Sequence, residues 1–217
     1  MATSRYLPAG AEAEFEPGSR GRVLRNSLGI RLVRDIKLAE SQRLGIAQTQ
    51  AIDLFSDTHR FTQVDVCNLH RLWLAPVYPW AGEFRGVNLG KGGFQFAAAA
   101  QVPRLMAEFE RDVLGRLTPC LPARQPDVAN ALAIVHAELI LIHPFREGNG
   151  RLARLLALLM GLQAGLPPLN FSSLDGNGKQ RYIAAIHAAV ARDYQPLSEI
   201  FLRAIKQTWK THSSSSR

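Results

Sequence analysis

Apolar residues recur at intervals of three or four along most of the chain, and this spacing is typical of amphipathic helices. The pattern predicts helices over residues 34–55, 62–74, 100–117, 128–142, 149–165, 179–191 and 196–210. Prolines follow several of these segments, and a proline disfavours the α conformation in the residue before it. Pro76, Pro144 and Pro167 therefore explain where three of the predicted helices end.

Residues 85–96 show a different pattern. Val87-Asn88-Leu89 and Phe94-Gln95-Phe96 alternate apolar and polar positions with a period of two, and Gly90-Lys91-Gly92-Gly93 lies between them. Two alternating segments around a glycine-rich turn predict a short β-hairpin. The expected fold class is therefore mainly α: a helical bundle that carries one short β-hairpin.

The length of 217 residues suits a single domain with a small appendage. Residues 1–30 mix glycine, proline and charged residues with little periodicity, so we expect an N-terminal arm that is largely extended. The helical pattern then predicts one domain over residues 31–210, followed by a polar tail, 211–217, that we expect to be mobile.

The first residues lead into no apolar run, so no secretory signal is expected. The two most apolar segments, 128–142 and 151–162, contain charged or histidine residues and fall short of the length that a membrane span needs. The two cysteines, Cys67 and Cys120, form no C-x-x-C pair, which argues against a thiolate zinc site. We therefore expect a cytoplasmic protein that does not enter a membrane.

The composition is basic, with a formal net charge of +8 and an isoelectric point of about 10.1. This balance favours anionic partners, namely nucleic acid, nucleotide phosphates or an acidic protein, without choosing among them. Lysines and arginines are spread along the chain with no run of five or six. Direct binding of nucleic acid is therefore not expected, and an ordinary solvated basic surface explains the charge equally well.

The candidate chemistry lies in one segment, which is followed by Arg154. The segment is His143-Pro144-Phe145-Arg146-Glu147-Gly148-Asn149-Gly150-Arg151. It is a tight polar loop that leads into a helix N-terminus, where free amides and the helix dipole favour an anion. Arg151 and Arg154 are three residues apart and share one helical face, so they can clamp a polyphosphate. A carboxylate at Glu147 faces this site, and a bridging Mg²⁺ would reconcile it with phosphates. His143 can accept a proton at neutral pH. Together these groups predict a phosphoryl- or nucleotidyl-transfer site.

The same residues resemble the signature of the Fic (filamentation induced by cAMP) family, H-x-F-x-[D/E]-G-N-G-R-x-x-R, at every fixed position. Two further segments are similar to parts of the family. The aromatic turn before the family's flap resembles Tyr78-Pro79-Trp80-Ala81-Gly82-Glu83-Phe84-Arg85, and the flap itself resembles Lys91-Gly92-Gly93-Phe94. The resemblance covers about residues 30–205 and implies a Fic-type helical bundle. The implied activity is adenylylation, in which AMP moves from ATP to a side-chain hydroxyl of a protein.

The resemblance also implies a role for each matching residue. His143 would deprotonate the target hydroxyl, Glu147 would hold Mg²⁺, and Phe145 would anchor the loop in the core. The implied ATP-binding residues are Gly148, Asn149, Gly150, Arg151, Arg154, Lys91 and Gly92. The implied flap, Lys91, Gly92, Gly93 and Phe94, would dock an extended segment of the target as an added strand.

Many Fic proteins carry an inhibitory helix with the pattern [S/T]-x-x-x-E-[G/N], and no such pattern occurs in this sequence. Within the family, this absence resembles toxins that are restrained by a separate small antitoxin, which supplies the inhibitory glutamate. Similar toxins modify type II topoisomerases, which suggests one candidate target. Two alternatives remain open: transfer of phosphate or another nucleotide moiety by the same site, and a nucleotide-binding module without catalysis.

Overall fold

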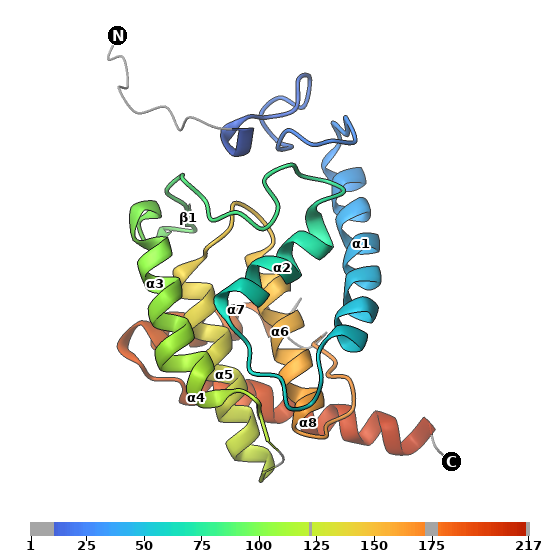
Figure 1. Cartoon of the computed structure of the whole chain (residues 1–217), viewed down its shortest axis with the longest axis vertical. Helices are drawn as coiled ribbons and strands as arrows, with labels where there is room; N and C mark the ends of the chain where they lie inside the picture. Colours follow the sequence, from blue (N-terminus) through green and yellow to red (C-terminus); the bar gives the residue numbers. More distant parts are fainter. Residues whose placement is uncertain (1–10, 122, 172–177, 216–217) are drawn as a thin grey trace.

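Two apolar helices, α5 (Gln125–Ile142) and α6 (Asn149–Gln163), form the centre of the molecule in the computed structural model, which describes residues 11–121, 123–171 and 178–215 (Figure 1). Most of their side chains are buried, and α5 contacts α6, α8 and α3. Among the described helices, α5 alone has the length and apolar composition of a membrane span. Its buried position in the bundle is that of a core helix.

Helices α1 (Val33–Leu54) and α2 (Gln63–Leu74) cover one side of α6. Helix α2 begins at a capping box, because Thr62 accepts a hydrogen bond from the backbone of Asp65 and the Asp65 carboxylate accepts one from the backbone of Thr62. Each bond satisfies an amide that the helix itself leaves without a partner. The predicted helices 34–55 and 62–74 are thus confirmed.

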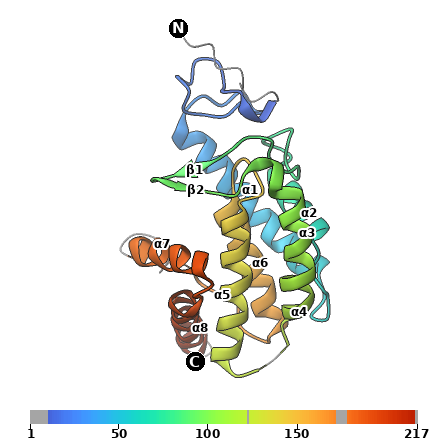
Figure 2. The same ribbon diagram turned by 90° about the vertical axis from the view of Figure 1, so that its left-hand side faces the viewer.

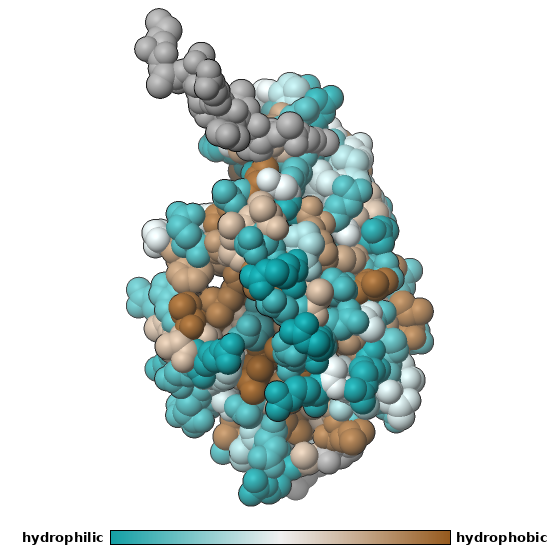
Figure 3. All heavy atoms as spheres, turned by 60° about the vertical axis from the view of Figure 1, so that its left-hand side comes forward, coloured by the Kyte–Doolittle hydropathy of each residue, from teal (hydrophilic) through white to brown (hydrophobic). Residues whose placement is uncertain are grey.

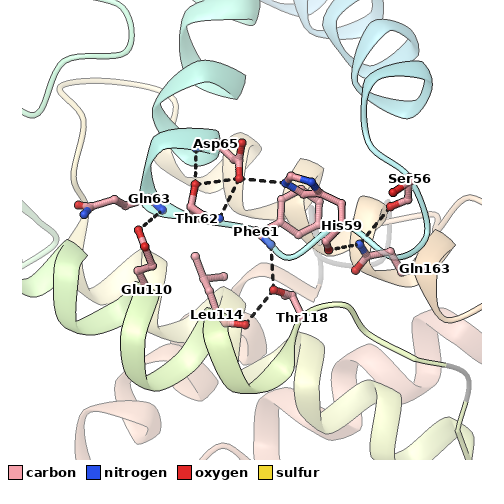
Figure 4. A network of polar contacts seen from close by, with 10 residues as sticks. All are labelled: Ser56, His59, Phe61, Thr62, Gln63, Asp65, Glu110, Leu114, Thr118 and Gln163. Carbon is pink, nitrogen blue, oxygen red and sulfur yellow. Dashed lines mark hydrogen bonds and ion pairs between the residues drawn. The ribbon is translucent and has the colours of Figure 1, made fainter.

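A polar network fixes the start of α2 against its neighbours (Figure 4). The backbone amide of Gln63 donates to Glu110, and that of Phe61 donates to the hydroxyl of Thr118 at 3.0 Å. The side-chain amide of Gln163 donates to the carbonyl of His59 at 2.7 Å. These bonds tie the start of α2 and the loop before it to the α3–α4 run and to the end of α6.

The predicted helix over residues 100–117 is present as one continuous helical run. It consists of η2 (Ala99–Gln101), α3 (Val102–Phe109), a π-helical turn η3 (Glu110–Leu114) and α4 (Gly115–Leu117). On the opposite side, α7 (Lys179–Ala188), η6 (Ala189–Ala191) and α8 (Gln195–Ser215) pack on α5 (Figure 2). Helix α8 continues through residues 211–215, which the sequence analysis assigned to the polar tail.

The N-terminal arm is mostly irregular over the residues described. It contains one short helix, η1 (Ala11–Ala13), and an isolated bridge between Phe15 and Leu24. The side chain of Asn26 shapes the segment that leads into α1, since it donates to the carbonyls of Leu24 and Ile30 and accepts from the amide of Ile30. The expected first residues of the arm, 1–10, lie outside the described part of the chain.

The β-hairpin is present and shorter than the sequence pattern predicts. Its strands are β1 (Gly90–Lys91) and β2 (Phe94–Gln95), which pair antiparallel with Lys91 opposite Phe94. Gly92 and Gly93 both have positive φ and form the two-residue turn. The predicted turn of four residues was therefore wrong, because Gly90 and Lys91 belong to the first strand. The hairpin projects from the bundle close to the start of α6 (Figure 2).

Overall, the expected fold class, a mainly α bundle with one short hairpin, is confirmed. The hairpin, the arm and the loop between α5 and α6 all lie at one end of the molecule (Figures 1 and 2). The face drawn in Figure 3 is mostly hydrophilic, with smaller hydrophobic patches.

Candidate functional site

The loop between α5 and α6 is shaped by a glycine and an asparagine. Gly148 has a φ of +84°, and a Cβ placed there would lie 2.7 Å from the ring of Trp73, so no other residue fits without displacement. The side-chain amide of Asn149 accepts a hydrogen bond from the backbone N–H of Phe145 and donates one to its carbonyl, at 2.9 and 2.7 Å. These contacts hold the loop in a single conformation before the helix begins.

His143 ends α5 in a left-handed conformation with φ +53°. Its Nδ1 lies 3.1 Å from the carbonyl of Ile140, and its ring stacks on Phe96 at 3.6 Å between centroids. Because a carbonyl only accepts, Nδ1 carries the proton and Nε2 has the free lone pair. Burial, helped by the nearby charge of Arg85, lowers the pKa of His143 to about 4. The imidazole is therefore neutral at physiological pH and can accept a proton.

A buried arginine, Arg85, holds the end of α5 and the base of the hairpin together. Its guanidinium donates to the carbonyls of His143, Val87, Ala97 and Ile142, at 2.6, 2.6, 2.5 and 3.2 Å. Its own amide donates to the carbonyl of Pro144. One side chain therefore fixes the backbone of the candidate base and both segments that flank the hairpin.

Phe145 is fully buried and stacks face to face on His70 at 3.9 Å between ring centroids. His70 accepts a hydrogen bond at Nδ1 from the amide of Gly82 at 2.8 Å, so Nε2 donates to the carbonyl of Glu147 at 3.1 Å. Burial lowers the pKa of His70 to about 4, which keeps it neutral. His70 thus joins the aromatic turn to the loop, and its role is structural.

The first turn of α6 forms the candidate anion cradle. The first amides of a helix have no intrahelical partner, and those of Gly148, Asn149 and Gly150 lie at this N-terminus. The amide of Gly148 donates to Oε1 of Glu147 at 2.9 Å, so this carboxylate folds back over the cradle. A Cβ at Gly150 would meet nothing within 4 Å, which leaves the approach to the cradle open at that position.

Arg151 and Arg154 project from the same face of α6. A buried carboxylate of α1, Glu40, accepts a hydrogen bond from Arg151 at 2.8 Å, and the guanidinium lies 4.7 Å from the ring centroid of Trp73. The hydroxyl of Tyr78 donates to the other oxygen of Glu40 at 2.7 Å. Arg151 is therefore held in place from two sides. Arg154 is half-buried further along the helix.

The hairpin covers the candidate base from above. Phe96 stacks on His143, and Phe94 stacks on His187 of α7 at 5.0 Å between centroids. Lys91, Gly92 and Gly93 are exposed at the tip. The hairpin therefore bridges α7 and the motif loop, and its exposed tip is accessible to an extended peptide.

The donor set fits a magnesium ion that is held jointly with phosphates. Within the described residues there is no cluster of three His, Cys, Asp or Glu side chains that could bind a metal alone. Glu147 supplies one carboxylate, which is 45% exposed. Magnesium is commonly held by one or two carboxylates together with substrate phosphates, so the single carboxylate fits that arrangement.

The sequence analysis missed three residues that shape the site: Arg85, Glu40 and the bridging role of His70. Only Glu40 left a clear signal. It follows Ile36 and precedes Leu44 at intervals of four, so it is a lone carboxylate on the apolar face of the predicted helix. A buried charge of this kind requires a partner, and here the partner is Arg151. The hydroxyl of Tyr182, on α7, lies 2.7 Å from Nε2 of His136.

The sequence matches known proteins over its central region. Residues 60–160 match the Fic/DOC family. The chain is 31% identical over 144 residues to the protein adenylyltransferase fic-1 of Caenorhabditis briggsae, which covers 66% of this chain and 27% of that protein. It is 36% identical over 106 residues to the protein adenylyltransferase Fic of Drosophila melanogaster, which covers 48% of this chain and 20% of that protein. The chain thus spans about a quarter of the length of these curated relatives.

Solved structures show the same fold. The N-terminal Fic domain of a Bartonella effector protein (Bep) from Bartonella sp. AR 15-3 matches with a TM-score of 0.71 at 18% identity and covers 94% of each chain. The BepC protein of Bartonella tribocorum, solved with bound AMPPNP, matches with a TM-score of 0.67 at 20% identity and covers 83% of this chain and 91% of that one. The fold is therefore that of a Fic-type helical domain. Residues 60–160, which match the Fic/DOC family, contain the whole motif from His143 to Arg154.

Proposed function

We propose that this protein is an adenylyltransferase that moves AMP from ATP to a hydroxyl side chain of a target protein. The observation that carries the proposal is the placement of a neutral histidine, His143, five residues before Gly148, which caps the N-terminus of α6. The curated relatives are named protein adenylyltransferases, which supports the same reaction class. Serine, threonine and tyrosine hydroxyls are the acceptors that this chemistry allows.

In this reaction Nε2 of His143 takes the proton of the target hydroxyl. The hydroxyl oxygen forms a bond to the α-phosphorus of ATP, the bond from that phosphorus to the bridging oxygen breaks, and diphosphate leaves. The carbonyl of Ile140 holds the proton on Nδ1, and the stacked ring of Phe96 fixes the plane of the imidazole. The base is thereby oriented before the substrate arrives.

The amides of Gly148, Asn149 and Gly150 bind the phosphate oxygens, and the α6 dipole adds to the attraction. Arg151 and Arg154 bind the outer phosphates and stabilise the charge that develops on the leaving diphosphate. Glu147 would hold Mg²⁺, which when bound neutralises phosphate charge. To expose the Gly148 amide, the Glu147 carboxylate turns away from it. Phe145 keeps the loop anchored throughout.

The hairpin residues Lys91, Gly92, Gly93 and Phe94 dock the target. Their exposed backbone can pair with an extended segment as an added strand, which would bring the acceptor hydroxyl beside His143. Lys91 and Gly92 lie at the tip, where they can also approach the bound nucleotide. We infer that the reaction takes place in the cytoplasm, and type II topoisomerases are one class of candidate target.

The test is labelling of a bacterial lysate with ATP that carries the label on the α-phosphate. We expect a labelled protein band with the native protein and none with His143→Ala. Label from the γ-phosphate instead would indicate phosphate transfer, and equal labelling by the two proteins would contradict the proposal. Intact mass of the modified protein should show one added AMP.

We further infer that a separate antitoxin restrains the enzyme. A groove of about 330 Å³ runs along α1 and α6 and carries both motif arginines at its rim. Its lining consists of Leu44, Gln48, Arg151, Arg154, Leu155, Leu158, Leu169 and Phe171. An amphipathic helix with one glutamate fits this combination of apolar floor and paired guanidinium groups. The test is co-purification with the product of a neighbouring short reading frame. Loss of AMP transfer on its addition would support the inference, and unchanged transfer would overturn it.

A further inference from the structure

A basic surface on the arm and the first turn of α1 takes no part in the reaction proposed above. Between residues 18 and 37 the chain carries six cationic side chains and one acidic residue, Asp35. The cationic residues, all exposed, are Arg20, Arg22, Arg25, Arg31, Arg34 and Lys37. Arg34 pairs with Asp35 and Arg25 pairs with Glu14. Across the described ranges, Arg22, Arg31 and Lys37 form no ion pair, so their charge is available to a partner.

Two adjoining hollows gather these cations. The outer hollow, of about 400 Å³, is lined by Arg22, Arg31, Leu32, Val33 and Arg34. The inner hollow, of about 350 Å³, shares Arg22 and Val33 with it and also includes Lys37. We call the two together the basic trough. At its inner end the lining includes Arg151 and the carboxylates of Glu40 and Glu147, so the trough leads from the cationic surface to the motif and its positive charge lies at the outer end.

The arm that forms one wall of the trough is fixed to the site by hydrogen bonds. Glu12 accepts from the amide of Gly86 through its side chain at 2.6 Å and from Arg146 of the motif loop through its carbonyl at 3.0 Å. The amide of Ser27 donates to the carbonyl of Val77 at 2.8 Å, next to the aromatic turn. The trough therefore keeps a fixed position relative to the motif loop, which lies at the same end of the molecule as the arm (Figure 1).

The lining favours a polypeptide over a nucleic acid. Leu32 and Val33 are 51% and 36% exposed and lie between the guanidinium groups, so the trough offers apolar contact together with charge. Hollows of about 400 and 350 Å³ hold several side chains of a peptide, whereas a nucleic acid presents a regular line of phosphates that would use an open basic face. Guanidinium groups bind carboxylates in a two-pronged geometry, which suits glutamate and aspartate side chains.

We propose that the basic trough binds an acidic segment of the protein that is modified, and so selects targets with carboxylates near the acceptor hydroxyl. The inference that the bound protein is the target rests on the proposed function. The binding itself does not depend on catalysis. Docking at the trough and at the hairpin gives a target two separate contacts on either side of the motif loop.

The test uses a fluorescein-labelled decapeptide of alternating glutamate and glycine, with fluorescence anisotropy of the full chain at low salt. We expect saturable binding that weakens as salt is added. The triple variant Arg22→Gln/Arg31→Gln/Arg34→Gln should raise Kd at least tenfold. A peptide with glutamine in place of glutamate should not bind.

The matched control is Arg116→Gln/Arg203→Gln/Lys206→Gln, which removes the same charge from exposed positions on α4 and α8. An equal loss of peptide binding in this control would overturn the proposal, because net charge alone would then explain binding. A second contrary result is that a labelled oligothymidylate binds more tightly than the acidic peptide and loses its binding in the Arg22, Arg31 and Arg34 variant. That result would also overturn the proposal and would indicate a nucleic-acid site. Circular dichroism establishes that both triple variants fold.

The proposed function fails separately from this inference. One outcome is that the protein transfers no AMP from α-labelled ATP while the triple variant Arg22→Gln/Arg31→Gln/Arg34→Gln loses binding of the peptide. In that case the acidic-peptide site stands and the adenylyltransferase proposal falls. If AMP transfer depends on His143 while the peptide binds equally well to all variants, the trough proposal falls alone. The same triple variant should bind ATP with the Kd of the native protein.

Discussion

The guanidinium of Arg85 donates a 2.6 Å hydrogen bond from Nε to the backbone carbonyl of His143. Since His143 has a left-handed backbone and Arg85 also binds three other carbonyls, this side chain determines where the candidate base lies. Arg85 touches no part of the anion cradle described above, so it is a positioning residue for the reaction.

We expect Arg85→Lys to lower kcat at least about tenfold while KM for ATP changes little, because lysine cannot reach four carbonyls at once. The variant should also lose about 2–3 kcal/mol in free energy of unfolding, since hydrogen bonds to a charged group are strong. Steady-state kinetics and urea denaturation measure the two effects. Arg116→Lys, on an exposed position, is the control. A rise in KM for ATP with unchanged kcat would contradict this role.

The pH dependence of the reaction follows from the burial of His143. Only the neutral imidazole accepts a proton, and burial lowers its pKa from 6.5 to about 4. The pH profile of kcat/KM reports the ionisable groups of the free enzyme. The acidic limb of this profile should therefore lie near pH 4. Activity should stay level as the pH falls from 7.5 through 6. An acidic limb at pH 6.5 would contradict this prediction, because it would show that the imidazole of His143 is exposed to water.

Phe96→Ala provides a second test of the same feature. Removal of the stacked ring exposes the imidazole to water, and this change should return the pKa of His143 toward 6.5. The acidic limb should then move upward, although the catalytic residue itself is unchanged. Phe94→Ala, which removes the ring that stacks on His187, should leave the limb in place.

Two glycines of the cradle should respond differently to the same substitution. Gly148→Ala places a methyl group against Trp73 at positive φ, so we expect a loss of stability of about 1–3 kcal/mol. Gly150→Ala meets open space and should fold normally. Its methyl group lies where phosphates would approach, so KM for ATP should rise. Thermal unfolding and ATP titration separate the two effects, and equal stability of the two variants would contradict the packing argument.

Acid should destabilise the protein between about pH 6.5 and 4. Burial lowers the pKa of His70, His136 and His143 to about 4 in the folded protein. In this window the unfolded chain binds more protons, so the free energy of unfolding rises with pH and falls on acidification. Each histidine contributes a slope of at most about 1.4 kcal/mol per pH unit. His136→Gln should reduce the measured slope, because it removes one of these three buried imidazoles.

The sequence predicted the helices well because their signals are local. The apolar spacing of α1, the cap at Thr62 and the proline after His143 each act within a few residues. The loop residues were also predictable as a group, since a contiguous run of chain places them side by side. Their roles in catalysis stay predictions until the labelling experiment is done.

The contacts that hold the loop could not be predicted in the same way. Arg85 and His143 are 58 residues apart, and Glu40 and Arg151 are 111 apart. No periodicity specifies which buried cation meets which carbonyl or carboxylate over such separations. The pairing of the hairpin could not be specified for a related reason: Gly90, Lys91, Gly92 and Gly93 are four candidate turn residues in a row, and they allow several alignments.

The four bonds of Arg85 also affect the field at the motif. The C-terminus of α5 and the N-terminus of α6 both lie at the motif. The negative end of the α5 dipole is therefore close to the positive end of the α6 dipole. A fixed cation on the last carbonyls of α5 cancels the end that would repel a triphosphate. The attractive end of α6 is then left to act on an approaching nucleotide without opposition from its neighbour.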